Sequence, residues 1–417
     1  MRKSNQFLAL GSLLILLLGV VLVGAWLRFG VGQRGSNPLQ FTTPASKTCR
    51  GGWEQMPMDV SKYIPLRLQG VAAISSQDIW AVGDSLIEHW NGTQWQPVLT
   101  QAVQHGTWTA ITALSAHDLW VIGQANGVPQ ALHWDGKTWT STSMPTPSPG
   151  VVTLAGITAI APDNAWIVGS SRSGNDPNDT YQPLMLHWNG TSWREVSGAT
   201  TPTGSTPQFG GISAVSATDI WVVGNMVEAT RVSQELIEHW NGTTWQLVPP
   251  PQDTSAYHNV TLNAVAAVAA NDVWAVGSGF FSGDGSVSGA SGLIEHWDGH
   301  TWSYIHINAP ESRSNGFVSI KAISPTNIWA VGSFVNPNTR LGGAYMQHWD
   351  GKQWGMNIWP VFYGQLTDNS SVGLADISGT PDGHIIAVGS SVVFTQNPPI
   401  DDAARNPAQP FILASCH

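Results

Sequence analysis

The stretch LIEHWNGTTWQLVP, residues 236–249, decides the fold of this chain. A run of alternating apolar residues leads into Asn241-Gly242, and a second run opens on Trp245. Asn-Gly between two such runs is a strong short-range signal for a β-hairpin, and it predicts positive φ at both turn residues. Very similar stretches occur five more times in the chain, so the hairpin is one part of a repeat.

The repeated unit is longer than the hairpin. It starts with small and β-branched residues, such as GVAAIS (70–75), and continues through a short turn ending in Asp or Asn into a strand such as DIWAVG (78–83). A unit of four strands that recurs every 40 to 57 residues is typical of propeller blades. The Trp of the second strand marks six copies, at Trp80, Trp120, Trp166, Trp221, Trp274 and Trp329, and Ile386 takes its place in a seventh.

The seventh copy lacks a fourth strand, and the start of the repeat region can supply one. The segment CRGGWEQMP (49–57) has the Gly turn, the Trp and the trailing Pro of a fourth strand. We therefore predict an all-β, seven-bladed β-propeller of four-stranded antiparallel blades, in which this N-terminal strand completes the last blade.

The two cysteines flank the predicted junction. Cys49 begins the borrowed strand and Cys416 ends its neighbour, so we expect a disulfide between them. Closing so long a loop would stabilise the fold by roughly 5–6 kcal/mol in the loop-entropy treatment. A disulfide requires an oxidising compartment, which favours an extracytoplasmic domain. Two unpaired thiols in a cytosolic protein remain the alternative.

The amino terminus is predicted to be a separate element. Residues 7–27 form an uncharged apolar run close to the ~20 residues that cross a bilayer. We predict a short cytoplasmic tail (1–6), a transmembrane signal-anchor helix (7–27), a flexible tether (28–48) and the propeller (49–417). The protein would be a single-pass cell-membrane protein, or a secreted one if a signal peptidase cleaves after Val23-Gly24-Ala25.

Charge excludes one class of partner. The net charge is −10 and the 17 basic residues are scattered, so no basic stripe is present to bind a nucleic-acid backbone. The sequence points to no cofactor and no metal. The oligomeric state stays open.

Six His residues precede the hairpin Trp residues, and six such His residues could indicate a metal site. Each lies on a different blade, so they cannot converge on one ion. We expect a structural hydrogen bond to a turn backbone or to an Asx side chain instead. These residues are His89, His133, His187, His239, His296 and His348. The repeated Trp residues are expected to fill the gaps between blades.

The blade motif, IWAVG followed by LIEHWNGTTWQLVP, resembles the repeats of kelch and galactose-oxidase-type proteins, although the strand ends in a single glycine. The run HWDGKTW (133–139) is also similar to BNR, or Asp-box, propellers. These resemblances imply a propeller fold, and neither family's catalytic residues can be matched to this sequence.

Binding residues are expected in the loops between second and third strands, which vary in length on one face, here called the long-loop face. Candidates there are Arg172, Tyr181, Arg231, Phe280, Phe281, Arg340 and Tyr345. Asp176, Asn178 and Asp179 are a weaker calcium hypothesis. We predict a binding module for a protein or carbohydrate ligand rather than an enzyme. The alternatives are a sialidase-like glycoside-processing enzyme and an assembly or scaffold factor for a membrane complex.

Overall fold

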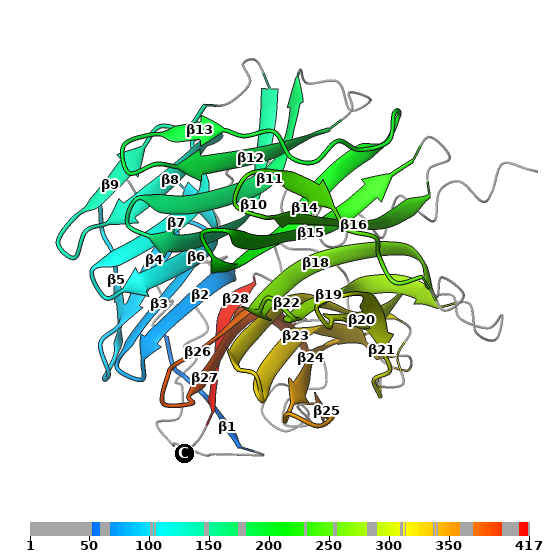
Figure 1. Ribbon diagram of the computed structural model, residues 1–417. Coiled ribbons are helices and arrows are strands. Elements are labelled where there is room, and N and C mark those ends of the chain that lie inside the picture. Colours follow the sequence, from blue (N-terminus) through cyan, green and yellow to red (C-terminus); the bar gives the residue numbers. More distant parts are fainter. Residues whose placement is uncertain are drawn as a thin grey trace, which may run out of the picture. The chain divides into compact units, whose positions relative to one another are not determined.

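The computed structural model describes residues 52–58, 67–100, 103, 106–145, 150–173, 181–228, 232–252, 257–281, 290–308, 312, 314–336, 338, 341–358, 370–393 and 408–415. This part of the chain is built from strands and turns (Figure 1). It includes no helix long and apolar enough to cross a membrane. The predicted tail, anchor and tether (1–6, 7–27 and 28–48) lie outside the described residues.

Seven four-stranded antiparallel sheets form the blades, which confirms the predicted fold. In each of blades 1 to 6, four consecutive strands follow one another from the inner to the outer edge. Blade 1 holds β2 (Leu68–Ser75), β3 (Asp78–Gly83), β4 (Leu86–Trp90) and β5 (Trp95–Pro97). Blade 2 holds β6 (Gly106–Ser115), β7 (Asp118–Ala125), β8 (Val128–Trp134) and β9 (Trp139–Thr142). Blade 3 holds β10 (Gly150–Ala161), β11 (Asn164–Ser173), β12 (Gln182–Trp188) and β13 (Trp193–Glu195).

The remaining blades repeat this order. Blade 4 holds β14 (Thr206–Ser216), β15 (Asp219–Val227), β16 (Ser233–Trp240) and β17 (Trp245–Leu247). Blade 5 holds β18 (Tyr257–Ala269), β19 (Asp272–Phe281), β20 (Ala290–Trp297) and β21 (Trp302–Ile305). Blade 6 holds β22 (Ser314–Ser324), β23 (Asn327–Val335), β24 (Gly342–Trp349) and β25 (Trp354–Ile358). Blade 7 holds β26 (Ser370–Gly379), β27 (Ile385–Val393), β28 (Gln409–Ser415) and β1 (Trp53–Gln55).

The blades close into a ring through their inner strands. Each inner strand contacts the inner strand of the next blade, and β26 of blade 7 contacts β2 of blade 1. Asp376 in β26 strengthens this last junction. Its carboxylate accepts a hydrogen bond from the Val71 N–H in blade 1 (2.9 Å) and another from the Ser319 hydroxyl in blade 6 (2.6 Å). One side chain thus bonds to both neighbouring blades.

The N-terminal strand completes the last blade, as predicted. Figure 1 shows β1 (blue) beside β28 (red), and the two are antiparallel, with Trp53 opposite Ser415 and Gln55 opposite Leu413. Cys49 and Cys416 lie outside the described residues, so the disulfide stays a prediction. Ser415, however, directly precedes Cys416 in the chain.

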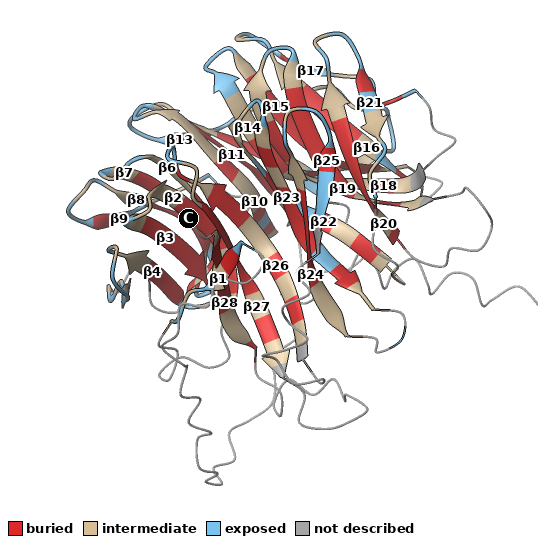
Figure 2. Cartoon of the chain, turned by 90° about the horizontal axis from the view of Figure 1, so that it is seen from below, coloured by how far each residue is buried: buried red, intermediate tan, exposed pale blue. Residues whose placement is uncertain are grey.

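Tryptophans fill the gaps between blades, because the twisted sheets leave wedge-shaped spaces that need large apolar side chains. Trp139 on the outer strand of blade 2 packs edge-on against Trp80 of blade 1, with ring centroids 5.6 Å apart and planes at 72°. The same pair recurs as Trp120 with Trp193 and as Trp221 with Trp302. Buried residues run along the strands and exposed ones gather in the turns (Figure 2).

The hairpin turns differ from the prediction. Trp240 pairs with Trp245, so four residues form the loop, and only Gly242 among them has positive φ (93°). Asn241 instead accepts hydrogen bonds at its side-chain oxygen from the N–H groups of Thr243 and Thr244, both at 3.0 Å. The prediction of positive φ at both turn residues is therefore wrong. Asp serves equally well as this acceptor, which explains the Asp-Gly copies.

Candidate functional site

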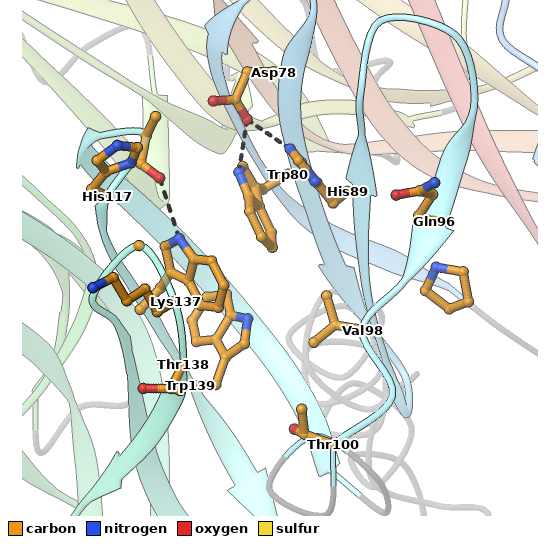
Figure 3. A pocket seen from close by; sticks show the side chains of 14 residues that line it. Asp78, Trp80, His89, Gln96, Val98, Thr100, His117, Lys137, Thr138 and Trp139 are labelled. Atoms are coloured by element: carbon orange, nitrogen blue, oxygen red, sulfur yellow. Dashed lines mark hydrogen bonds and ion pairs between the residues drawn. The ribbon is translucent and has the colours of Figure 1, made fainter.

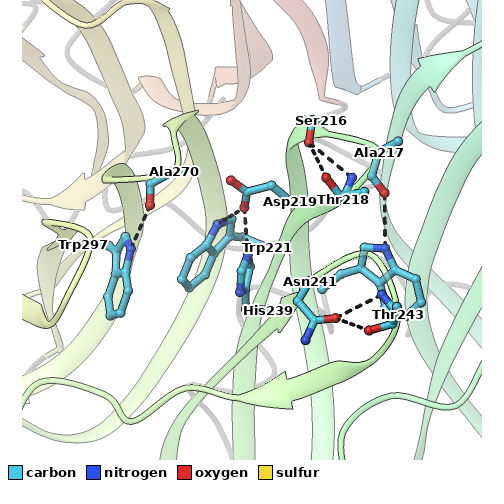
Figure 4. A network of polar contacts seen from close by, with 11 residues as sticks. Ser216, Ala217, Thr218, Asp219, Trp221, His239, Asn241, Thr243, Ala270 and Trp297 are labelled. Atoms are coloured by element: carbon cyan, nitrogen blue, oxygen red, sulfur yellow. Dashed lines mark hydrogen bonds and ion pairs between the residues drawn. The ribbon is translucent and has the colours of Figure 1, made fainter.

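The six His residues are structural, as expected. In blade 4 the His239 Nε2–H donates to Asp219 Oδ1 (2.8 Å), and the Trp221 indole N–H donates to the same oxygen (2.9 Å). Figure 4 shows the three side chains meeting at the start of the second strand. His239 also stacks on Trp221, with ring centroids 4.3 Å apart. One carboxylate oxygen therefore fixes both rings.

The His bond recurs in the other five complete copies, and the Trp bond recurs in four of them, since the Trp120 N–H in blade 2 has no partner among the described residues. The His Nε2 atoms lie 2.8–3.0 Å from an Asp or Asn oxygen at the equivalent position. In blades 3 and 6 the acceptor is a neutral amide, and burial lowers the pKa of His187 and His348 there. The acceptors are Asp78, Asp118, Asn164, Asp272 and Asn327.

In blade 1 the same unit forms part of a groove between blades 1 and 2 (Figure 3). The groove has a volume of about 610 Å³. Its walls are mainly apolar and aromatic, including Trp80, Val98, Trp134 and Trp139. Polar side chains also line it, among them Asp78, His89, Gln96, Thr100, His117, Lys137 and Thr138. Cavities of this size with mostly apolar walls and a few polar groups are typical of ligand sites.

Two residues that line this groove each carry a buried polar atom with no hydrogen-bond partner among the described residues. These atoms are the Trp139 indole Nε1 and the Thr100 hydroxyl Oγ1. Trp139 is only 9% exposed. A buried polar group without a partner costs about 1–3 kcal/mol, so a ligand that supplied the missing bonds would recover part of that free energy.

The neighbouring gap shows one way in which this Trp N–H can be satisfied. Between blades 2 and 3 the Trp193 indole N–H donates to the Thr142 hydroxyl (3.0 Å), and Met144 packs into the same gap. The equivalent residues between blades 1 and 2 are Val98 and Thr100. Val98 cannot accept the Trp139 N–H, and Thr100 occupies less volume than Met144. The bond to Thr142 is the exception within the repeat, because the equivalent residue is Val in blades 1, 3 and 4. The indole N–H groups of Trp139, Trp245, Trp302 and Trp354 all lack a partner among the described residues.

One end of the groove lies on the face opposite the predicted one. Ala116 and His117 belong to the turn between β6 and β7, and residues 136–138 belong to the hairpin between β8 and β9. These turns share one end of the blade because successive strands are antiparallel. Sequence reasoning placed binding on the long-loop face and missed the groove.

On the long-loop face, two predicted residues come together. The Arg172 guanidinium lies over the Tyr181 ring, 5.4 Å from its centroid, in a cation–π contact. Arg172 Nε is also buried, and no described residue forms a hydrogen bond with it. Arg172 is, however, a residue of β11 rather than of a loop, because the strands extend farther than the sequence pattern indicated.

Tyr345 was wrongly predicted to lie in a binding loop. It belongs to β24, is fully buried, and stacks on Phe317 with ring centroids 4.7 Å apart. Phe280 likewise lies in β19, half-buried, and Phe281 ends that strand. Arg231 and Arg340, and the calcium candidates Asp176, Asn178 and Asp179, lie outside the described residues. Within the described ranges no three or more His, Cys, Asp or Glu residues gather as a metal site.

Comparison with known proteins bears on the fold alone. No protein-family model matches the sequence, and no curated protein matches it. Among solved structures, YCF48 bound to D1 peptide is similar over 88% of this chain and 98% of that one, with 15% identity and a TM-score of 0.51. YCF48 from Cyanidioschyzon merolae covers 87% of this chain and 98% of its own, with 14% identity and a TM-score of 0.53.

A third similar structure is the extracellular domain of the putative one-component system BT4673 from B. thetaiotaomicron. The match covers 81% of this chain and 38% of that one, with 12% identity and a TM-score of 0.52. These structures share the seven-bladed β-propeller fold. The kelch and BNR resemblances are not confirmed beyond that fold.

Proposed function

We propose that this chain is a binding module that takes a protein or carbohydrate ligand in the groove between blades 1 and 2. The observation that carries the proposal is one aromatic groove lined by Trp139 and Thr100, whose buried Nε1 and Oγ1 atoms have no partner among the described residues. A backbone carbonyl of a peptide or a hydroxyl of a sugar could accept the Trp139 N–H. The apolar walls would pack against the rest of the ligand.

The repeat itself provides the test. The double variant Val98→Thr/Thr100→Met gives this gap the residues that close the next one, Thr142 and Met144, so the variant is expected to fold. The full-length chain in mild detergent would be screened against a displayed peptide library and a glycan array. Ligands of the wild type should lose at least about tenfold in affinity for the variant, the effect of ~1.4 kcal/mol. Equal affinity of the ligands for the wild type and the variant would contradict binding in the groove.

The long-loop face is a second candidate surface, favoured by the Arg172–Tyr181 contact. An Arg guanidinium stacked on an aromatic ring is a common anchor in recognition surfaces. Tyr181→Ala removes the ring beneath the guanidinium and leaves the groove intact. Ligands that are lost with Tyr181→Ala and kept by the groove variant would assign binding to this face.

The proposal includes the location of the module. The uncharged run 7–27 and the Cys49–Cys416 pair support a propeller tethered outside the cytoplasmic membrane. Proteolysis of intact and opened cells would test this. We expect the propeller to be degraded from the outside, with the chain resisting alkaline extraction from membranes. Full protection in intact cells, or release by alkali, would contradict the tethered arrangement.

A further inference from the structure

The gap between blades 4 and 5 departs from the repeat in a different way. Glu295 in β20 is fully buried, and neither of its carboxylate oxygens has a hydrogen-bond partner among the described residues. Equivalent third-strand positions in other blades hold Glu88, Glu238 and Gln347, or a Leu. A buried carboxyl group without a partner is rare, because taking its charge out of water is costly.

The equivalent residues show what Glu295 lacks. Glu238 accepts a hydrogen bond from the Ala199 N–H (2.9 Å), and Gln347 donates to the Asn308 carbonyl (2.7 Å). Ala199 and Asn308 both stand six residues after the outer-strand Trp of the preceding blade. In the gap before Glu295 that position is Pro251, which has no N–H to donate. Glu295 therefore cannot accept the backbone hydrogen bond that Glu238 accepts.

A second acidic residue faces the same gap. Ile237 and Leu293 lie in the apolar cluster between blades 4 and 5. Glu235 is two residues from Ile237 and Glu295 is two residues from Leu293, so each points to the same side of its strand as that apolar neighbour. Both carboxyl groups therefore face the gap from opposite blades. The charge of Glu235 adds to burial in raising the pKa of Glu295 well above its usual value.

Tyr304 connects the two acids. It lies directly opposite Glu295 in the ladder between β20 and β21, and its hydroxyl donates a hydrogen bond to Glu235 Oε1. No other blade combines a Glu at the position of Glu235 with a Tyr at the position of Tyr304. The positions equivalent to Glu235 are Ser85, Pro129, Pro183, Gly292, Ala344 and Pro410. Those equivalent to Tyr304 are Gln55, Pro97, Ser141, Glu195, Leu247 and Met356.

We propose that Glu235 and Glu295 supply the carboxylate ligands of a calcium site between blades 4 and 5, with Tyr304 as a positioning residue. Calcium takes six to eight oxygen ligands in flexible geometry, so backbone carbonyls and water can complete the shell. The hydrogen bond at Glu235 Oε1 fixes that carboxylate and leaves Oε2 available. The enclosure of Glu295 favours a small ion over the basic side chain of a partner, which could not reach a fully buried carboxylate.

The test uses the full-length chain in mild detergent, freed of metal with a chelator and titrated with CaCl2 by calorimetry. We expect one equivalent of Ca²⁺ to bind and to raise the melting temperature. Glu295→Gln keeps the side-chain size and removes the charge, and it should weaken binding at least about tenfold. Glu238→Gln is the matched control at the same strand position, and it should bind Ca²⁺ as the wild type does.

Tyr304→Phe tests whether Tyr304 positions the Glu235 carboxylate for Ca²⁺ or only stabilises the fold. It should weaken Ca²⁺ binding by less than Glu295→Gln does, while the metal-free melting temperature stays close to that of the wild type. The proposal is overturned if the wild type binds no Ca²⁺ at mildly alkaline pH. It is also overturned if Glu295→Gln, shown to be folded by its cooperative melt, binds Ca²⁺ with unchanged affinity.

Discussion

Trp53 and Trp329 pack edge to face, with ring centroids 5.3 Å apart and planes at 88°. Trp329 belongs to the second strand of blade 6, and Trp53 lies on the strand that the start of the chain contributes to blade 7. This contact repeats the geometry of Trp80 with Trp139 between blades 1 and 2. The borrowed strand therefore takes the same place in the packing as an ordinary outer strand.

Removing the Trp53 ring should destabilise the fold strongly. Trp53→Ala is expected to lower the free energy of unfolding by about 3–5 kcal/mol, because the side chain is buried against Trp329 and leaves a cavity. Denaturant unfolding followed by circular dichroism measures this. Trp95→Ala is the matched control, since that outer-strand Trp is only half-buried, and it should cost less. Equal losses of stability in the two variants would show that the packing of blade 7 against blade 6 does not depend on Trp53.

Substitutions of Asp219 should separate hydrogen bonding from charge. Asp219→Asn is expected to change stability by less than about 1 kcal/mol, because Asn164 and Asn327 hold the equivalent rings through an amide oxygen. Asp219→Ala leaves the buried Trp221 N–H without an acceptor and should cost about 1–3 kcal/mol. Thermal unfolding compares the two variants. A large loss in Asp219→Asn would mean that ionic attraction to His239 is the main contribution.

Glu238 should make stability depend on pH. Burial raises its pKa from 4.5 to about 7, against a weaker lowering by the Ala199 N–H. Its folded-state pKa is thus above the unfolded value, so its stabilising contribution is complete below pH ~4.5 and is lost as the pH rises through about 7. The loss should amount to about 3 kcal/mol. Urea unfolding across this range measures it.

The control for that prediction is Glu238→Gln, measured with a chelator present to exclude bound metal. The amide oxygen of Gln can still accept the Ala199 N–H, and it does not titrate. The pH dependence should flatten in this variant. An unchanged slope would assign the titration to another buried acid, such as Glu295, whose pKa is raised in the same direction.

Val98→Thr alone should stabilise the protein. A Thr at this position can accept the Trp139 N–H as Thr142 accepts that of Trp193, and a satisfied buried hydrogen bond contributes about 0.5–1.5 kcal/mol. The increase is measured by chemical unfolding. Thr142→Val provides the reciprocal experiment and should cost a similar amount. If Val98→Thr brings no gain in stability and Thr142→Val brings no loss, the indole N–H contributes little in either gap.

The Cys49–Cys416 disulfide is directly testable. The intact mass of the non-reduced chain should be smaller by two hydrogens than that of the reduced chain, and reduction should lower the melting temperature. Cys416→Ser should melt like the reduced wild type. Free thiols in both cysteines of protein isolated from its native compartment would contradict the prediction.

The repeat made most of the fold predictable. The recurring second-strand Trp set the number of blades, and Trp53 before Met56-Pro57 identified the borrowed strand. The His residues could be assigned to hydrogen bonds because identical residues on separate blades cannot meet. The turn conformation was missed because Asn-Gly also fits a four-residue loop in which only Gly242 needs positive φ.

The binding residues were less predictable, for a physical reason. Tyr345 carries the same sequence signal as an exposed loop aromatic, and only the length of β24 shows that it is buried. The groove includes a Trp139 N–H that has no acceptor at Val98, and the acidic pair depends on an N–H missing at Pro251. Such absences become visible only when the register of every blade is known.

The borrowed strand also determines the order in which the molecule can be completed. Blades 1 to 6 are each made from consecutive residues, so each can assemble as soon as its own four strands have left the ribosome. The last sheet joins Trp53 to Ser415, and it has to wait until β28 has been synthesised. Until then the backbone of β1 stays unpaired. Any shortening of the chain that removes β28 leaves the ring of blades open.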